Sequence, residues 1–416
     1  MRGLTHSLSE EGKGLLVQVL LAEVAKRARA LVPPQPQPPD KQPDKLAAAA
    51  AAALPDLRQA AAVTCAVHAL TSLYSDMGGG APSAETWDML QQLAGACWTP
   101  TRVAVAQCLA AIGAKSPHLL LPSIRRSLPA LLAEASLAQG MRGAAAVQGM
   151  CMALVSTAMT ALEHTHGLPC ELLDSFMSVA NMLLKESARA SADSEVLCCC
   201  VEGGWRLISV CVRCGGEWVE GYLPLLLKLS ADFLPANVGE QLAPADGAAS
   251  SSAWARAMLG AAGALTALRT LLLEHAHLLQ GQPARARHIS LLLARALHSD
   301  LVVKSAKVAA DTRHRAAASP ALAALTTALA DVLKLRLLEF AAAAPQAILL
   351  PDARAAILKR ALQVVARAPG KRGAVSTLGN ELVNPDDDLL LPHDLDRPPG
   401  SRARRCPCRW RCRCRC

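Results

Sequence analysis

Five of the fifteen cysteines lie in one short stretch, CCCVEGGWRLISVCVRC, from Cys198 to Cys214. The stretch ends in a Cys-x-x-Cys pair that two glycines follow. Thiolates at this spacing bind zinc or take part in thiol–disulfide exchange. A structural zinc site needs four ligands, and the second half would have to come from the three consecutive cysteines that open the stretch. Consecutive residues point in different directions on a helix, so the spacing argues against a closed metal site.

The same stretch also has the pattern of an amphipathic helix. Trp205, Ile208 and Val212 recur at helical spacing, and Cys211 lies on an adjacent strip. Gly215 is a typical residue after a helix end. We therefore predict that these cysteines are small apolar residues of a helix, and a metal-binding or redox protein remains the alternative function.

Two histidine pairs could also bind a metal. They lie in EHTHGLP, from Glu163 to Pro169, and in EHAHLL, at His275 and His277. Residues two apart face away from each other on a helix, and histidine close to a helix C-terminus interacts favourably with the helix dipole. We predict helix ends here and no metal ligands.

The sequence contains none of the common catalytic motifs. There is no Gly-x-Ser-x-Gly, no phosphate-binding Gly-x-x-x-x-Gly-Lys-Ser/Thr and no Gly-x-Gly-x-x-Gly. We therefore predict a protein that is not an enzyme, with no catalytic, cofactor-binding or metal-binding residues and no small-molecule substrate.

The positive charge is concentrated at the end of the chain. The last twenty residues, RPPGSRARRCPCRWRCRCRC, hold eight arginines and no acid, and so account for all but one of the nine net charges. The remaining chain lacks the basic stripe that nucleic acids require, so we predict no nucleic-acid partner. A basic-tail binder of nucleic acid or anionic lipid is a further alternative. The abrupt change of composition is also typical of translated non-coding or misframed sequence.

The composition predicts closely packed helices. Hydrophobic residues make up 52% of the 416 residues and aromatics only 3%, so most of the apolar surface comes from Ala, Leu and Val. Helical patterns alternate with short segments rich in Pro, Gly, Asp or Ser. We expect helices over residues 8–31, 46–76, 85–97, 101–114, 119–135, 142–164, 171–187, 194–214, 217–234, 251–279, 284–297, 321–343 and 352–367.

Several of these segments resemble one another. Those that begin at Leu57, Thr101, Met141 and Trp254 each open close to an arginine and continue with small apolar residues into a terminal Leu or Ile. The first three of these arginines are roughly forty residues apart, the period of HEAT-type helix pairs. Alanine-rich seams let paired helices approach closely, and stacked pairs share a continuous core. We predict an all-α fold, an α-solenoid of HEAT/armadillo-type helix pairs. Unrelated helical bundles are the alternative.

The expected organisation has six parts. They are an N-terminal helix (residues 1–31), a proline-rich linker (32–45), HEAT-like repeats (46–241), a flexible loop (242–252), further HEAT-like repeats (253–368) and a disordered tail (369–416). The charge-free stretch from Gly143 to Leu162 is long enough to cross a bilayer, but it is rich in Ala, Gly, Ser and Thr and matches the repeat helices. Cysteines that occur singly in helical patterns, and a first segment unlike a secretory signal, favour a cytoplasmic protein.

One helix pair carries a family resemblance. GWRLISVCVRCGGEWVEGYLPLLLKLSADFLP, from Gly204 to Pro235, resembles the HEAT repeat-containing protein 5 family in its Gly-Trp start, its central glycine, its Leu-Pro step and its closing proline. GLPCELLDSFMSVANMLLKES before it, and AAGALTALRTLLLEHAHLL and LKLRLLEFAAAAPQAIL after it, fit in the same order. The resemblance covers Thr99 to Arg367 and departs from the family at Ser230, where a Trp is expected.

The resemblance implies a function as well as a fold. It implies a non-enzymatic scaffold that is recruited from the cytosol to Golgi and endosomal vesicles. The implied partners are clathrin adaptor complexes and their accessory proteins, which would also supply the peripheral membrane association. The implied processes are endosome-to-Golgi retrieval, endocytosis and protein localisation. Members of this family are much longer, so we expect the chain to correspond to an internal portion of such a protein.

Overall fold

The computed structural model describes residues 9–31, 57–76, 83–96, 98–138, 140–165, 167–186, 194–234, 247–279, 282–298, 320–344 and 359. Within these residues every regular element is a helix, so the fold is all-α. The elements are α2 (Glu10–Leu31), α4 (Leu57–Asp76), α5 (Ala84–Leu93), α6 (Thr99–Lys115), η1 (Pro117–Leu119), α7 (Leu120–Leu137), α8 (Gly140–His164), α9 (Cys170–Glu186), α10 (Ser194–Cys214), α11 (Gly216–Phe233), α12 (Gly247–His275), η2 (Ala276–Leu278), α13 (Pro283–His298) and α15 (Pro320–Ala343).

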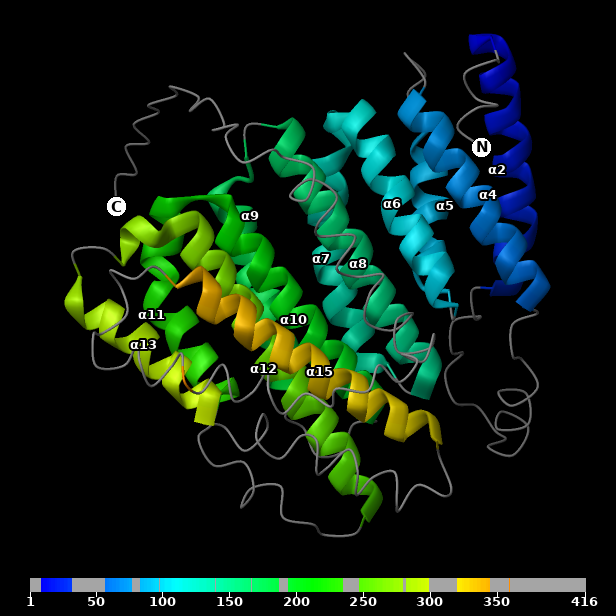
Figure 1. The fold of residues 1–416 in the computed structure, drawn as a ribbon. Coiled ribbons are helices and arrows are strands. Elements are labelled where there is room, and N and C mark those ends of the chain that lie inside the picture. Colours follow the sequence, from blue (N-terminus) through cyan, green and yellow to red (C-terminus); the bar gives the residue numbers. More distant parts are fainter. Residues whose placement is uncertain are drawn as a thin grey trace.

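The helices form two layers that alternate along the chain. The inner layer is a row in which each member packs on the next, in the order α2, α4, α6, α8, α10, α12 and α15. The outer layer consists of α5, α7, α9, α11 and α13, which cover the row. Figure 1 shows the row in chain order from α2 at the right, through α4, α6 and α8, to α10 and α12 near the centre. This arrangement is consistent with an α-solenoid.

Hydrogen bonds show that α6 and α8 in the inner layer, and α5 and α7 in the outer layer, run parallel. In the inner layer Arg102 of α6 contacts Gln148 of α8, and one turn later Ser156 of α8 donates to the Ala106 carbonyl. In the outer layer Trp87 of α5 donates a hydrogen bond to Ser123 of α7. One turn further along both helices, Gln91 donates to Ser127, so these two helices also run in the same direction. Parallel neighbours follow from the connections, because each return helix lies in the other layer.

Glycines allow neighbouring helices to approach closely. A Cβ added at Gly149 would lie 1.7 Å from the carbonyl oxygen of Ala94, and one added at Gly263 would lie 2.5 Å from the Cβ of Trp205. One hydrophobic cluster extends from Val17 in α2 to Ala344 after α15. The described helices thus share a core, as stacked helix pairs do.

The helix boundaries confirm most of the expected segments. The segment predicted over 194–214 coincides with α10, and most other described helices begin and end within a few residues of the prediction. The helix predicted over 46–76 is described as α4 from Leu57, and residues 46–56 lie outside the described residues. The expected helix over 352–367, the linker over 32–45 and the tail over 369–416 lie outside the described residues, apart from Lys359.

One boundary needs correction. The loop expected over residues 242–252 is helical from Gly247, because its Ala and Ser residues lead directly into the apolar run of α12. The N-terminal helix, α2, packs on α4 as a member of the inner row, and its Val17 and Val24 belong to the shared core.

Candidate functional site

The cysteine-rich stretch forms α10, in the middle of the inner row. Cys200 and Cys211 are buried, whereas Cys198, Cys199 and Cys214 are half-buried. Trp205 is 2% exposed and its ring meets Phe233 of α11 edge-on, with the ring centroids 5.4 Å apart. The predicted apolar helix is confirmed, since the Trp205, Ile208 and Val212 strip lies in the core.

Burial keeps these thiols in their neutral form. It raises the pKa of Cys214 from its ordinary value near 9 to about 12, and that of Cys198 to about 11. The pKa values of Cys199 and Cys211 are also raised, mainly by the same loss of hydration. Thiolates are the species that bind metals and attack disulfides, and burial disfavours them here. Among the residues that the structure describes, no group of three or more His, Cys, Asp or Glu side chains is placed to hold a metal ion.

Single cysteines elsewhere divide into two kinds. Cys108 and Cys151 are buried, and burial raises the pKa of Cys108 to about 12. Cys65, by contrast, is exposed on α4. Cys97 lies outside the described residues.

His164 and His275, the first members of the two histidine pairs, lie at helix ends, as predicted, and His166 lies outside the described residues. His164 is the last residue of α8, and the chain then turns at Gly167, whose φ of 98° suits glycine. His275 is the last residue of α12, and its Nε2 lies 2.6 Å from the Val212 carbonyl oxygen. That carbonyl is one of the last four of α10, which have no partner within the helix. His275 thus links the C-terminal ends of α10 and α12.

A partly buried chain of polar side chains crosses the inner row. Arg102, which is 4% exposed, donates to Gln148 Oε1 at 2.6 Å, and the Gln148 amide donates to Glu202 Oε2 at 3.2 Å. Arg206 completes the chain through a 2.7 Å ion pair with Glu202. We call these four residues the polar chain. Arg102 also donates to the Ala96 carbonyl and to the Thr99 hydroxyl, both at 2.8 Å.

The polar chain was not predicted from the sequence. The arginines that mark the sequence repeats take different positions, because Arg58 is exposed and Arg142 half-buried while Arg102 is in the core. The available local signal was the pair Glu202 and Arg206, which lie four residues apart on α10.

The outer layer carries a cluster between α9 and α11 in which Asp174 is exposed and Trp218 and Tyr222 are half-buried. Trp218 and Tyr222 are stacked, with centroids 4.2 Å apart and planes inclined by 21°. Both donate to the same oxygen of Asp174, the Trp218 Nε1 at 2.9 Å and the Tyr222 hydroxyl at 2.8 Å. The hydrogen bond to Asp174 is the main cause of a raised Tyr222 pKa. We call these three residues the aromatic patch.

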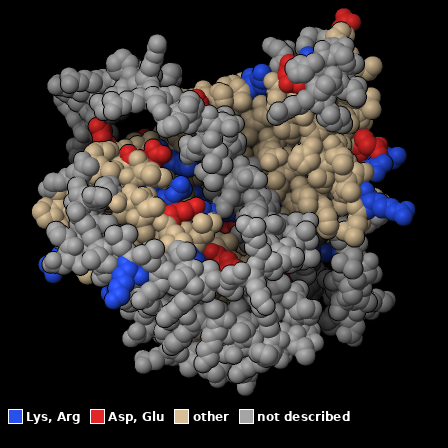
Figure 2. All heavy atoms as spheres, in the orientation of Figure 1, with Lys and Arg blue, Asp and Glu red and all other residues tan. Residues whose placement is uncertain are grey.

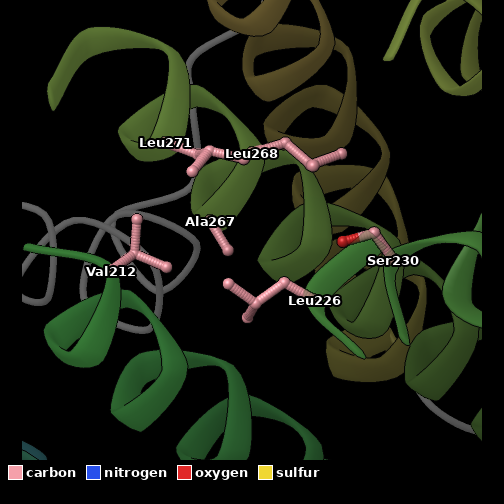
Figure 3. Close-up of a pocket in the computed structure, with 6 residues that line it drawn as sticks. All are labelled: Val212, Leu226, Ser230, Ala267, Leu268 and Leu271. Atoms are coloured by element: carbon pink, nitrogen blue, oxygen red, sulfur yellow. The ribbon is translucent and has the colours of Figure 1, made fainter. Parts of the chain in front are cut away.

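A small pocket lies where α10, α11 and α12 meet. It is lined by Val212, Leu226, Ser230, Ala267, Leu268 and Leu271, and Figure 3 shows their side chains around it. The hydroxyl of Ser230 is the polar side-chain group in this lining. The enclosed space is about that of one water molecule. The position where the family resemblance leads one to expect Trp therefore faces a small apolar gap.

Within the part of the chain that the structure describes, two helices are long and apolar enough to cross a membrane, Arg142–His164 in α8 and Ala253–Leu278 in α12 with η2. A third results if Thr99–Lys115 and Pro117–Leu137, which are bent by 116°, count as one span. In the structure 72% of the apolar window of the first and 61% of that of the second are buried by other parts of the chain. The packing of the row accounts for much of their apolar composition.

The charges on the described surface are mixed. Figure 2 shows Lys and Arg interspersed with Asp and Glu on the face that it draws. Ion pairs also connect the outer helices, from Arg126 to Asp88 and from Arg285 to Glu220.

Comparisons with protein families, with characterised proteins and with solved structures find no match to this chain.

Proposed function

We propose that the protein is a HEAT-type α-solenoid that acts as a non-enzymatic scaffold in clathrin-adaptor-dependent vesicle traffic between the Golgi and endosomes. Its partners in this proposal are adaptor complexes and their accessory proteins, through which it associates peripherally with vesicles from the cytoplasm. The observation that carries the proposal is the two-layer stack of helices with a continuous core. Such stacks present extended surfaces on which proteins bind.

The residues behind the family resemblance support the proposal through their packing. Gly204 lets α10 approach α9, because a Cβ there would lie 2.9 Å from the Leu184 Cγ. Trp205 fills the space beside Gly263 of α12 and Phe233 of α11. The Gly-Trp start of the resembling segment is thus the point where the helices of two neighbouring pairs meet.

The proposal is tested in cells. The full chain carrying a fluorescent tag is imaged together with clathrin adaptors, before and after acute removal of the adaptor complex. The expected result is a vesicle-bound fraction that overlaps with the adaptors and disperses into the cytosol on their removal. A uniform cytosolic distribution that adaptor removal leaves unchanged would contradict the proposal.

A further inference from the structure

The aromatic patch brings three unusual features together on the surface. Aromatic residues are only 3% of the chain, yet Trp218 and Tyr222 stack on the outer layer while Trp87, Trp205 and Phe176 lie in the core. Stacked rings present flat apolar faces that lose little conformational entropy when a partner binds.

The carboxylate of the patch is held in place before any partner arrives. Both aromatic donors bond to Oδ1 of Asp174, which fixes the orientation of the side chain. No described residue donates to its second oxygen, and Asp174 is exposed. A fixed carboxylate beside aromatic rings suits an arginine side chain. Its guanidinium can form an ion pair with the carboxylate and stack on a ring face.

The surroundings of the patch are acidic. The first two turns of α9 and α11 contain four carboxylates and no Lys or Arg, the acids being Glu171, Asp174, Glu217 and Glu220. Arg285 of α13 pairs with Glu220 at 3.3 Å, and no described cation pairs with the other three. Carboxylates are favoured at helix N-termini, so the fold itself stabilises this negative surface.

From these features we propose that the aromatic patch docks an arginine-bearing basic segment of a partner protein. The arginine stacks on the Trp218 and Tyr222 rings and pairs with Asp174, and the flanking Glu171 and Glu217 attract the basic residues beside it. The inference rests on the proposed scaffold function, for which it names the chemistry of one partner segment.

The test measures binding of a fluorescein-labelled peptide of repeated Gly-Arg-Leu triplets to the full chain by fluorescence anisotropy. We expect Trp218→Leu and Asp174→Asn each to weaken binding about fivefold or more. Asp88→Asn is the matched control, because it removes an exposed outer-layer carboxylate at a distance from the patch, and it should change binding less than about twofold. A peptide of Gly-Glu-Leu triplets should not bind.

Tyr222→Phe provides a second, milder variant. It keeps the ring but removes one donor to Asp174, so binding should weaken by less than with Trp218→Leu, and circular dichroism shows whether each variant is folded. Absence of Gly-Arg-Leu binding, equal binding of the acidic peptide, or binding that folded Trp218→Leu leaves unchanged would overturn the inference. If adaptors recruit the protein but the peptide does not bind, the docking proposal fails and the scaffold function stands. If the peptide binds but adaptors do not recruit the protein, the docking proposal stands and the trafficking role fails.

Discussion

The guanidinium of Arg102 donates to the side-chain oxygen of Gln148 at 2.6 Å, inside the inner row of helices. This contact joins α6 to α8, and Glu202 carries it on to α10. A buried cation needs such partners, because an uncompensated charge in the core is strongly destabilising. The polar chain therefore fixes the register of three helices as well as linking them.

Removing the cation from the polar chain should cost much of the stability. Arg102→Met leaves the Gln148 side-chain oxygen and the Ala96 carbonyl without their donor, and we expect the free energy of unfolding to fall by about 3 kcal/mol. Arg126→Met, which removes the exposed 3.4 Å pair with Asp88, should cost less than about 1 kcal/mol. Urea unfolding of both variants measures the difference. Equal losses would show that the polar chain has no special role.

The close approach of α8 to the end of α5 depends on a missing side chain. Gly149→Ala places a Cβ 1.7 Å from the Ala94 carbonyl oxygen, so the backbone must shift, and we expect a loss of about 2 kcal/mol or more. Gly14→Ala in α2 meets no atom within 4 Å and should stabilise the helix by about 0.5 kcal/mol. Thermal unfolding of the two variants should shift in opposite directions. A stabilising Gly149→Ala would mean that the helices lie further apart.

Thiol labelling distinguishes core cysteines from reactive ones. Cys65 and Cys170 are exposed and should react with a maleimide in the folded protein, whereas Cys108, Cys151, Cys200 and Cys211 should react only after unfolding. Peptide mass spectrometry assigns the label to each site. Rapid native labelling of Cys200 or Cys211 would contradict the packing of α10 and restore a chemical role for that helix.

The buried thiols should also make stability depend on pH in the alkaline range. Burial raises the pKa of Cys108 to about 12, whereas in the unfolded chain it stays near 9. Between these values the unfolded state binds fewer protons, so the free energy of unfolding falls as pH rises. Below pH 9 the contribution is fully present. In Cys108→Ala this fall should be smaller by about 1.4 kcal/mol per pH unit in that window. Urea unfolding at a series of pH values measures the free energy of unfolding of both proteins. An equal fall of this free energy with pH in the two proteins would contradict the burial of the Cys108 thiol.

Periodicity and composition were sufficient to predict most helices. The predicted bounds of α10 match because its apolar strip and Gly215 are both local signals. The polar chain could not be predicted, since Gln148 lies 46 residues from Arg102 and Glu202 lies 54 residues beyond Gln148. Only the stacking of the helices brings these positions together.

The aromatic patch shows the same limit. Trp218 and Tyr222 are one helical turn apart, so their contact could be inferred from spacing. Their shared acceptor is Asp174 on α9, 44 residues before Trp218. The start of α12 at Gly247 was missed for a different reason, because Ala-Ser sequence is compatible with both loop and helix.

The most direct test of the scaffold function is affinity capture of the full chain from cell extract, with quantitative mass spectrometry of the bound proteins. A matched capture uses Gly149→Trp, whose disrupted packing should abolish surfaces that depend on the helix stack. Enrichment of clathrin adaptor subunits and their accessory proteins with the native chain, and their loss with the variant, is the predicted result. A native chain that captures neither, under conditions in which circular dichroism shows it to be folded, would contradict the account.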